Sequence, residues 1–333
     1  MKRFIRFILV DLLMILTFSL VSCSSNDNLQ TNEIRIGILN TPNDVAVARN
    51  KNYFQKAFPN KKITFITFDS GVDANKALMS GGVDFATMGD TNGIVALTAG
   101  IPVKLLWINE ICGSNECLIV RKNSGIKSIA DLKGKKIATP FASTSHYSLM
   151  ITLRNAGLEN KVKLLDMDTQ NIVAAWKRGN IDAAYTWQPT LSQLQNNGQV
   201  LTDSSDLFKK GYSTANITLV SKVFLKAHPN EVRKVVQVLA KTHRLRKDNY
   251  QMTVESAAKQ TGISQSDAAK QIKGTKWISL NEEYSKDYLG NEQEPGQFIL
   301  AMQRAGKFMY GQQTISYAPS LKQFQEFVYA GGN

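Results

Sequence analysis

Segments typical of β-strands alternate with segments typical of helices from residue 34 onward, and this alternation constrains the fold most strongly. The first strand-like runs occupy residues 34–39, 63–68, 83–88 and 103–108. Helical patterns at residues 72–80 and 92–99 lie between them, and each is followed by glycine, which commonly ends helices. Strands that alternate with helices in this way predict the mainly parallel sheet of an α/β protein.

The pattern begins again near residue 117. The second group of strand-like runs occupies residues 117–121, 136–139, 162–167 and 183–187, and helical patterns occupy 128–132, 144–155 and 172–178. We expect residues 117–121 and 217–220 to be strands that cross between the two groups. From residue 228 the chain is predicted to be mainly helical, including 231–246 and 264–272. Two α/β units joined by two crossings predict two lobes with a ligand cleft between them.

The first residues have the pattern of a secretion signal. Basic residues precede an apolar run over residues 7–21, which is shorter than the roughly 20 residues that span a bilayer. The run ends in Leu20-Val21-Ser22-Cys23, which resembles the bacterial lipobox, a motif whose cysteine is lipidated. We expect a lipoprotein signal peptide over residues 1–22, a flexible tether over 23–32, and a lipid anchor on Cys23. This would hold the protein on the extracytoplasmic side of the cell membrane.

The chain is basic, because 40 Lys and Arg against 27 Asp and Glu give a net charge of +13. A basic chain invites a role in binding nucleic acid. However, the Lys and Arg residues are spread along the chain, without a tight basic block or a basic patch interleaved with aromatic residues. We expect no nucleic-acid partner. A basic surface does attract small anions and anionic membranes at long range.

The two cysteines beyond the N-terminal region, Cys112 and Cys117, flank a short segment. Export permits a disulfide between them, and two free thiols suit the sequence equally well. A metal site is not expected, because His146, His228 and His243 lie far from this pair in the sequence. The sequence also lacks a Gly-rich phosphate loop and a Gly-x-Ser-x-Gly elbow. We therefore predict a protein that has no metal or cofactor and is not an enzyme.

Several motifs in the same order resemble the sulfonate, nitrate and taurine substrate-binding proteins of ABC importers. The motifs are Phe68-Asp69-Ser70-Gly71, then Ala77-Leu78-x-x-Gly81-x-x-Asp84 followed by Gly89, then Pro140 to Leu149, Ala174 to Pro189, and Gln199 to Ser204. The stretches Pro140 to Leu149 and Ala174 to Pro189 are most similar to the taurine-binding branch. The resemblance covers roughly residues 33–320.

This resemblance implies a two-lobed periplasmic-binding-protein fold (type II), in which each lobe is a mixed sheet flanked by helices. Residues 33–117 and 221–333 would form the first lobe, and residues 118–220 the second. The implied function is to capture taurine or a related small sulfonate and to deliver it to an ABC permease and its ATPase. The protein is expected to act as a monomer.

A sulfonate stays negatively charged at physiological pH and is best bound by hydrogen-bond donors, such as the free N–H groups at helix N-termini. Ser143 and Thr144 begin a predicted helix, so they either cap that helix only or also donate to the anion. The ligand-binding residues implied by the resemblance and by this reasoning are Thr41, Asp90, Thr91, Glu116, Ser143, Thr144, His146, Trp187, Gln188 and Asn216.

Several of these residues keep alternative roles. Asp90 is either a helix N-cap or a partner of the ligand's amine, and His146 is either a second donor or a support for the turn below it. Trp187 contacts the ligand or fills the core of the second lobe. Glu116 would attract an ammonium group. Asn216 occupies a position where similar taurine-binding proteins carry an aspartate, and its amide brings no charge. Either Asp90 and Glu116 supply the charge opposite the amine from the other side of the cleft, or the pocket near Asn216 is neutral and prefers an uncharged tail.

Other ligands and classes remain open at this point. An alkanesulfonate without an amine, nitrate, or a thiamin pyrimidine precursor would suit the same fold. A fold-related enzyme family that makes the thiamin pyrimidine carries a cysteine-rich iron motif, which Cys23, Cys112 and Cys117 do not form. A surface lipoprotein without a transport function is the remaining alternative.

Overall fold

The computed structural model describes residues 32–291, 293–329 and 331, which belong to one compact unit. The predicted signal segment of residues 1–22 and the predicted lipidation site Cys23 lie outside the described residues. Within residues 32–331, as far as they are described, we find no helix with the length and apolar character that crossing a bilayer requires.

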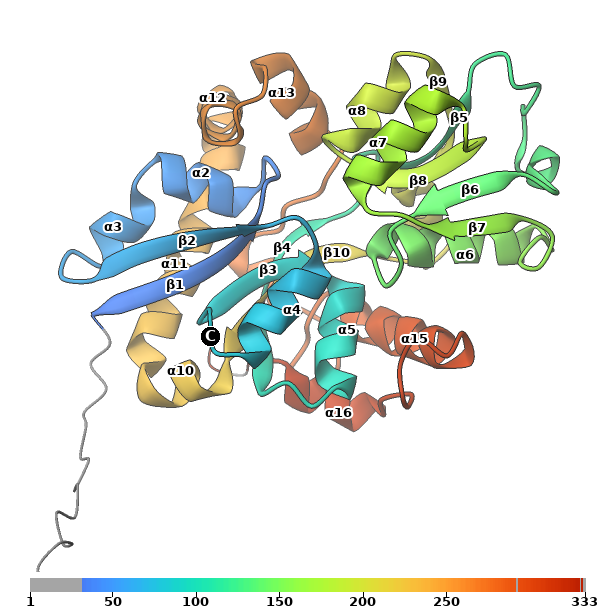
Figure 1. The fold of residues 1–333 in the computed structure, drawn as a ribbon. Coiled ribbons are helices and arrows are strands. Elements are labelled where there is room, and N and C mark those ends of the chain that lie inside the picture. Colours follow the sequence, from blue (N-terminus) through green and yellow to red (C-terminus); the bar gives the residue numbers. More distant parts are fainter. Residues whose placement is uncertain (1–31, 292, 330, 332–333) are drawn as a thin grey trace, which may run out of the picture. The chain divides into compact units, whose positions relative to one another are not determined.

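The first sheet has five strands in the order β2-β1-β3-β10-β4 (Figure 1). The bounds of these strands are β1 Glu33–Leu39, β2 Lys62–Phe68, β3 Phe85–Gly89, β4 Val103–Ile111 and β10 Ala215–Ser221. Parallel pairing joins β1 to β2 and to β3, whereas β10 lies antiparallel between β3 and β4. The ladder partner of β4 in this sheet is therefore β10, which follows it more than a hundred residues later.

The second sheet repeats this plan with five strands in the order β7-β6-β8-β5-β9. The bounds of these strands are β5 Glu116–Arg121, β6 Lys136–Thr139, β7 Lys163–Asp166, β8 Ala183–Trp187 and β9 Gly198–Asp203. Parallel pairing joins β6 to β7 and to β8, and β5 lies antiparallel between β8 and β9.

The two antiparallel strands are the ones that the chain reaches by crossing from one sheet to the other. β5 follows β4 directly, and β10 returns the chain from the second sheet to the first (Figure 1). This confirms the predicted α/β fold with two mixed sheets and two crossing strands. Pairing places β10 in the first sheet, and the lobe boundaries themselves stay a prediction.

Helices flank both sheets (Figure 1). Their bounds are α2 Asp44–Asn50, α3 Tyr53–Ala57, α4 Gly71–Met79, α5 Asp90–Thr98, α6 Thr144–Asn155, α7 Thr169–Arg178, α8 Thr190–Gln195, α9 Ser204–Phe208, α10 Lys222–Ala227, α11 Pro229–Asp248, α12 Tyr250–Thr261, α13 Gln265–Lys273, α14 Leu280–Glu283, α15 Gln297–Gly311 and α16 Leu321–Phe327; a 3-10 helix covers Ile129–Leu132. Many begin at a side chain that accepts a backbone N–H, as Ser70 does for α4 and Asp168 for α7.

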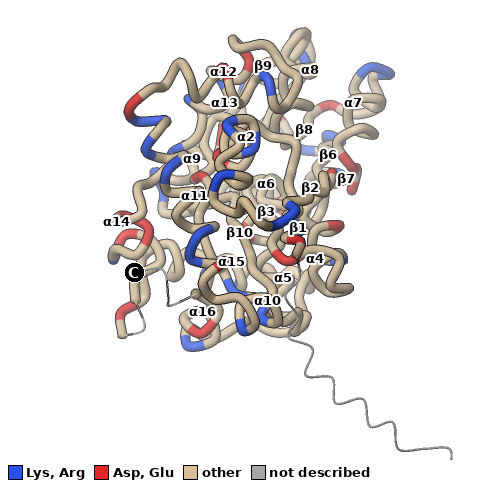
Figure 2. The backbone as a smooth tube through the Cα atoms, turned by 90° about the vertical axis from the view of Figure 1, so that its left-hand side faces the viewer, with Lys and Arg blue, Asp and Glu red and all other residues tan. Residues whose placement is uncertain are grey.

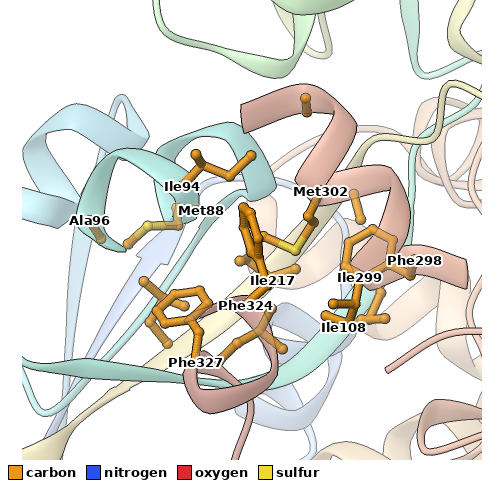
Figure 3. Close-up of a cluster of buried hydrophobic side chains, with 14 of the residues drawn as sticks. Met88, Ile94, Ala96, Ile108, Ile217, Phe298, Ile299, Met302, Phe324 and Phe327 are labelled. Carbon is orange, nitrogen blue, oxygen red and sulfur yellow. The ribbon is translucent and has the colours of Figure 1, made fainter. Parts of the chain in front are cut away.

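A buried apolar cluster holds α5 against the first sheet. Met88 of β3, Ile94 of α5 and Ile217 of β10 point toward Met302 of α15 and Phe324 of α16 (Figure 3). All of these side chains are almost completely buried. Because burial of each such side chain contributes roughly 1.5–3 kcal/mol, the cluster fixes where the N-terminus of α5 lies.

A buried polar network centred on Asp44 ties α2 to β4 and α11. One carboxylate oxygen of Asp44 accepts hydrogen bonds from the N–H of Val45 at 2.7 Å and from Asn109 Nδ2 at 2.8 Å. The other accepts from Trp107 Nε1 at 2.9 Å and lies 2.9 Å from His243 Nε2. The side chains of Asp44 and His243 are 0% and 2% exposed, so this is a fully desolvated polar cluster.

Candidate functional site

A pocket of about 760 Å³ that includes its mouth opens at the carboxyl ends of the parallel strands in both sheets. This is where ligands bind in α/β proteins, and the volume is typical of small-molecule sites. The lining residues are Leu39, Thr41, Pro42, Asp69, Ser70, Gly71, Val72, Gly89, Asn92, Glu110, Asn115, Glu116, Pro140, Phe141, Ser143, Thr144, Trp187, Gln188, Asn216, Gln271 and Thr275.

Three helices begin at this pocket. Ser70, the N-cap of α4, lines it together with Gly71, and Gly89, the N-cap of α5, lines it as well. Ser143, the N-cap of α6, completes the set. The N–H groups in the first turn of a helix lack intrahelical acceptors, and the helix dipole adds positive potential at that end. The pocket therefore offers an anion several backbone donors without a basic side chain.

Neighbouring side chains lie so close to Gly71 and Gly89 that neither position has room for a side chain of its own. A Cβ added to Gly71 would lie 2.2 Å from Asn92 Oδ1, and one added to Gly89 would lie 2.8 Å from Thr144 Cγ2. Gly89 has an ordinary backbone angle of φ −64°, so the requirement there is steric. The contact between Gly89 and Thr144 joins a helix of the first sheet to a helix of the second.

The hydroxyl groups of Ser143 and Thr144 are already used. Ser143 Oγ accepts the N–H of His146 at 3.1 Å and donates to the carbonyl of Pro140 at 2.6 Å. Thr144 Oγ1 donates to Glu116 Oε1. Ser143 is thus the predicted cap, and the donors that α6 leaves free for a ligand are its first backbone N–H groups.

Glu116 is buried at the start of β5 and has hydroxyl donors on both oxygens. Oε1 accepts from Thr144, and Oε2 accepts from Ser204 Oγ at 3.0 Å, which in turn lies 3.2 Å from the hydroxyl of Tyr185. Burial raises the pKa of Glu116, and the hydrogen bonds from Thr144 and Ser204 oppose that rise. The network fixes the carboxyl group at the pocket wall beside Trp187, its cross-strand neighbour on β8.

Glu110 is a pocket residue that sequence reasoning missed. It lies on β4 directly opposite Asn216 on β10, and Asn216 Nδ2 donates to Glu110 Oε1 at 2.7 Å. Both residues line the pocket, although they are 106 positions apart in the sequence. The signal that could have indicated Glu110 is an acidic residue inside the apolar run of residues 103–111. Glu110 therefore places a carboxyl group beside Asn216, whose own side chain is an amide.

Asp90 and Thr91 lie behind the pocket wall. The N-cap of α5 is Gly89, so the alternative in which Asp90 caps the helix is wrong; Asp90 is its first residue. Asp90 is 1% exposed, and burial raises its pKa well above the ordinary value. Thr91 Oγ1 and Asn92 Nδ2 both donate to the carbonyl of Ala142, at 3.2 and 3.1 Å, and thereby bridge the two sheets.

The remaining predicted residues divide between lining and support. Thr41 lines the pocket, and its buried hydroxyl has no hydrogen-bond partner among the described residues. Trp187 and Gln188 also line it, with Gln188 Oε1 accepting from the N–H and hydroxyl of Ser192. His146 does not line the pocket; its ring stacks on Phe141 at 4.3 Å between centroids, which favours the supporting role.

Charge is distributed differently on the surface and in the pocket. Figure 2 shows Lys and Arg interspersed with Asp and Glu over the helices of the described chain. Of the described residues that line the pocket, three are acidic (Asp69, Glu110 and Glu116) and none is Lys or Arg. Cys112 and Cys117, for which the sequence left two alternatives, are both buried free thiols.

Comparison with protein families matches residues 43–248, more than half of the chain, to the family described as NMT1/THI5 like. The taurine-binding periplasmic protein of Escherichia coli (strain K12) is 36% identical over 188 residues, which cover 56% of this chain and 58% of that protein. The chain thus spans less than two thirds of that relative. A putative aliphatic sulfonates-binding protein of Bacillus subtilis (strain 168) is 28% identical over 292 residues, or 84% of this chain and 86% of that one.

Among solved structures, the alkanesulfonate-binding protein SsuA from Xanthomonas axonopodis pv. citri bound to MOPS has a TM-score of 0.74 to this chain. The alignment covers 90% of this chain and 99% of that one at 22% identity. At this identity the likeness establishes the fold alone, and it agrees with the two mixed sheets described above.

Proposed function

The chain belongs to the NMT1/THI5-like family, and from this premise we propose that it captures a small sulfonate outside the cytoplasm and delivers it to an ABC importer. The leading ligand is taurine, a sulfonate with an amino group. The observation that carries this proposal is the meeting of three helix N-termini and three carboxyl groups in one pocket.

The two sets of groups suit the two ends of such a ligand. Backbone N–H groups at the starts of α4, α5 and α6 bind an anion that never takes up a proton. Glu110 and Glu116 suit a cation, because a carboxylate and an ammonium form charge-assisted hydrogen bonds. Nitrate, which has no cationic end, would make no use of the charge of these carboxyl groups. The relatives that are named for taurine and for aliphatic sulfonates support the same ligand class.

The cellular setting is part of the proposal. The pattern Leu20-Val21-Ser22-Cys23 supports an acyl anchor on Cys23 that holds the protein on the extracytoplasmic face of the membrane. A monomer whose two lobes, residues 33–117 with 221–333 and residues 118–220, close on the ligand would then dock onto a permease that is driven by its ATPase. No catalytic role is proposed.

We expect the purified protein to bind ethanesulfonate and taurine and to be stabilised by both. A ligand that binds only the folded state, at about 100 times its Kd, raises the free energy of unfolding by about 2.7 kcal/mol. Calorimetry and thermal unfolding would measure this, with acetate at equal ionic strength as the control. Nitrate and a thiamin pyrimidine precursor form the competing arms. Binding of one of those ligands without either sulfonate would overturn the proposed function.

A separate prediction concerns the anchor. We expect Cys23→Ala to release the protein from membranes or to leave its precursor uncleaved, because the acyl chains have no other attachment point in the proposal. Membrane fractionation and mass spectrometry of the N-terminus would measure the outcome, with Cys112→Ala as the matched control. A Cys23→Ala protein that is processed and stays membrane-bound would reject lipidation.

A further inference from the structure

The Glu110–Asn216 pair presents a distinct set of acceptors to the pocket. Asn216 gives its Nδ2 hydrogen to Glu110 Oε1, so the carbonyl oxygen of its amide is directed away from that bond. No hydrogen bond to Glu110 Oε2 is found among the described residues. An ammonium group has three N–H donors and no acceptor, so two neighbouring acceptor oxygens suit it well. An uncharged alkyl tail makes no use of either oxygen.

We infer that Glu110, paired with Asn216, determines specificity for the tail of the ligand and favours one that ends in an ammonium group over one without charge. This inference rests on the proposed binding of sulfonates in the same pocket. It assigns the negative charge opposite the amine to Glu110 on β4. The resemblance implied that charge at position 216, on the neighbouring strand β10.

The distance from the anion end to this pair suits a short ligand. Gly89, Asn216 and Glu110 lie directly opposite one another on the neighbouring strands β3, β10 and β4. Adjacent strands are about 4.8 Å apart, so the start of α5 and the backbone of Glu110 are separated by roughly 10 Å. This separation is on the scale of a small ligand, such as a sulfonate and an ammonium joined by a two-carbon chain.

Protonation of Glu110 gives this recognition a measurable signature. Burial raises the pKa of Glu110 to about 8, and the hydrogen bond from Asn216 opposes that rise. At pH 7 the carboxyl group is then mostly protonated, and an arriving ammonium must displace that proton. The proton leaves to solvent, and the buried pair formed is a carboxylate with an ammonium.

The groups that face Glu110 from the surrounding elements set the background for this titration. They are Asp44 on α2, Cys112 after β4, Glu116 on β5 and Arg246 on α11. Arg246 lowers the pKa of Glu110, but its guanidinium donates to the carbonyls of Ile272 and Thr275. No ion pair between Arg246 and Glu110 is found among the described residues.

The experiment compares taurine with ethanesulfonate, which differ in the amino group, on the wild-type protein and on Glu110→Gln. Glutamine keeps the oxygen that accepts from Asn216 and removes the charge. In the wild type we expect taurine to bind at least tenfold more tightly than ethanesulfonate. Glu110→Gln should remove most of that preference, because a charge-assisted hydrogen bond is lost only for taurine. The affinity for ethanesulfonate should change less than about threefold. Glu326→Gln, at an exposed carboxyl group, is the matched control.

Proton release tests the same inference without any substitution. Calorimetry in buffers of different ionisation enthalpy should show release of up to one proton per taurine at pH 7 and none with ethanesulfonate. Since about a tenth of Glu110 is ionised at pH 7 and half at pH 8, taurine affinity should rise roughly fivefold over that interval. Ethanesulfonate affinity should not rise.

The outcomes separate this inference from the function on which it rests. If both sulfonates bind but Glu110→Gln leaves their affinity ratio unchanged, or weakens both equally, Glu110 does not recognise the tail and the inference is overturned alone. Equal proton release with both ligands would overturn it in the same way. If the wild-type protein binds neither sulfonate, the proposed function is overturned and this inference with it.

Discussion

Replacing Asp44 by alanine is expected to lower the free energy of unfolding by about 3–5 kcal/mol, because it leaves several buried hydrogen-bonding groups without their shared acceptor, at a cost of about 1–3 kcal/mol each. His243 would keep its Nδ1 contact with the carbonyl of Ile278 but lose the carboxylate at Nε2. Trp107 and Asn109 would also lose their buried acceptor, and each unsatisfied group adds a desolvation cost. Urea unfolding at pH 7, followed by circular dichroism, would measure the change.

Asp248→Ala provides the matched control, because this aspartate is exposed at the end of α11. We expect it to change the free energy of unfolding by less than about 0.5 kcal/mol, as surface substitutions usually do. A loss for Asp44→Ala that is no larger than this control would mean that the network around Asp44 contributes little to stability.

Gly89→Ala is expected to weaken sulfonate binding about tenfold to a hundredfold while the ligand-free protein still folds. Its new methyl group would lie 2.8 Å from Thr144 Cγ2, which cannot rotate freely because Thr144 Oγ1 is bonded to Glu116. Overpacking of this kind costs about 1–3 kcal/mol. Here the strained contact is the one between Gly89 and Thr144, on opposite walls of the pocket, so the cost reduces ligand affinity. Calorimetry with ethanesulfonate would give the loss of affinity.

Two further variants make this result interpretable. Thr144→Ser removes the clashing methyl group and keeps the hydroxyl, so it should restore most of the affinity in the Gly89→Ala background. Gly82→Ala should leave binding unchanged, because its Cβ would meet nothing closer than 3.4 Å. Unchanged affinity in Gly89→Ala alone would show that the pocket walls relax without cost.

Local patterns predicted most of the sheets but not all of the helices. Strands were predicted within a few residues because apolar, β-branched runs are buried on both faces of a central sheet. The short helices α2 and α3 were not predicted, since each is held by tertiary contacts rather than by its own periodicity. The sequence also ended the fourth strand at residue 108, whereas β4 continues to Ile111.

That difference of a few residues explains why Glu110 was missed at the candidate site. Asn109 and Glu110 read locally as the polar end of a strand. In the fold each has a distant partner, Asn109 bonding to Asp44 and Thr218 and Glu110 bonding to Asn216. Residues at helix starts, such as Ser143, could be predicted because capping is local. The opposite wall could not, because it depends on which strands become neighbours.

The position of β10 between β3 and β4 has a consequence for the order in which the chain can fold. β4 emerges early in synthesis, yet its ladder partner β10 follows only after the whole second sheet has been made. Until then β4 has unpaired backbone N–H and C=O groups, and such long-range pairing is slow. A chain truncated before residue 215 would lack a complete first sheet. The first sheet is therefore completed only after every strand of the second sheet has been made.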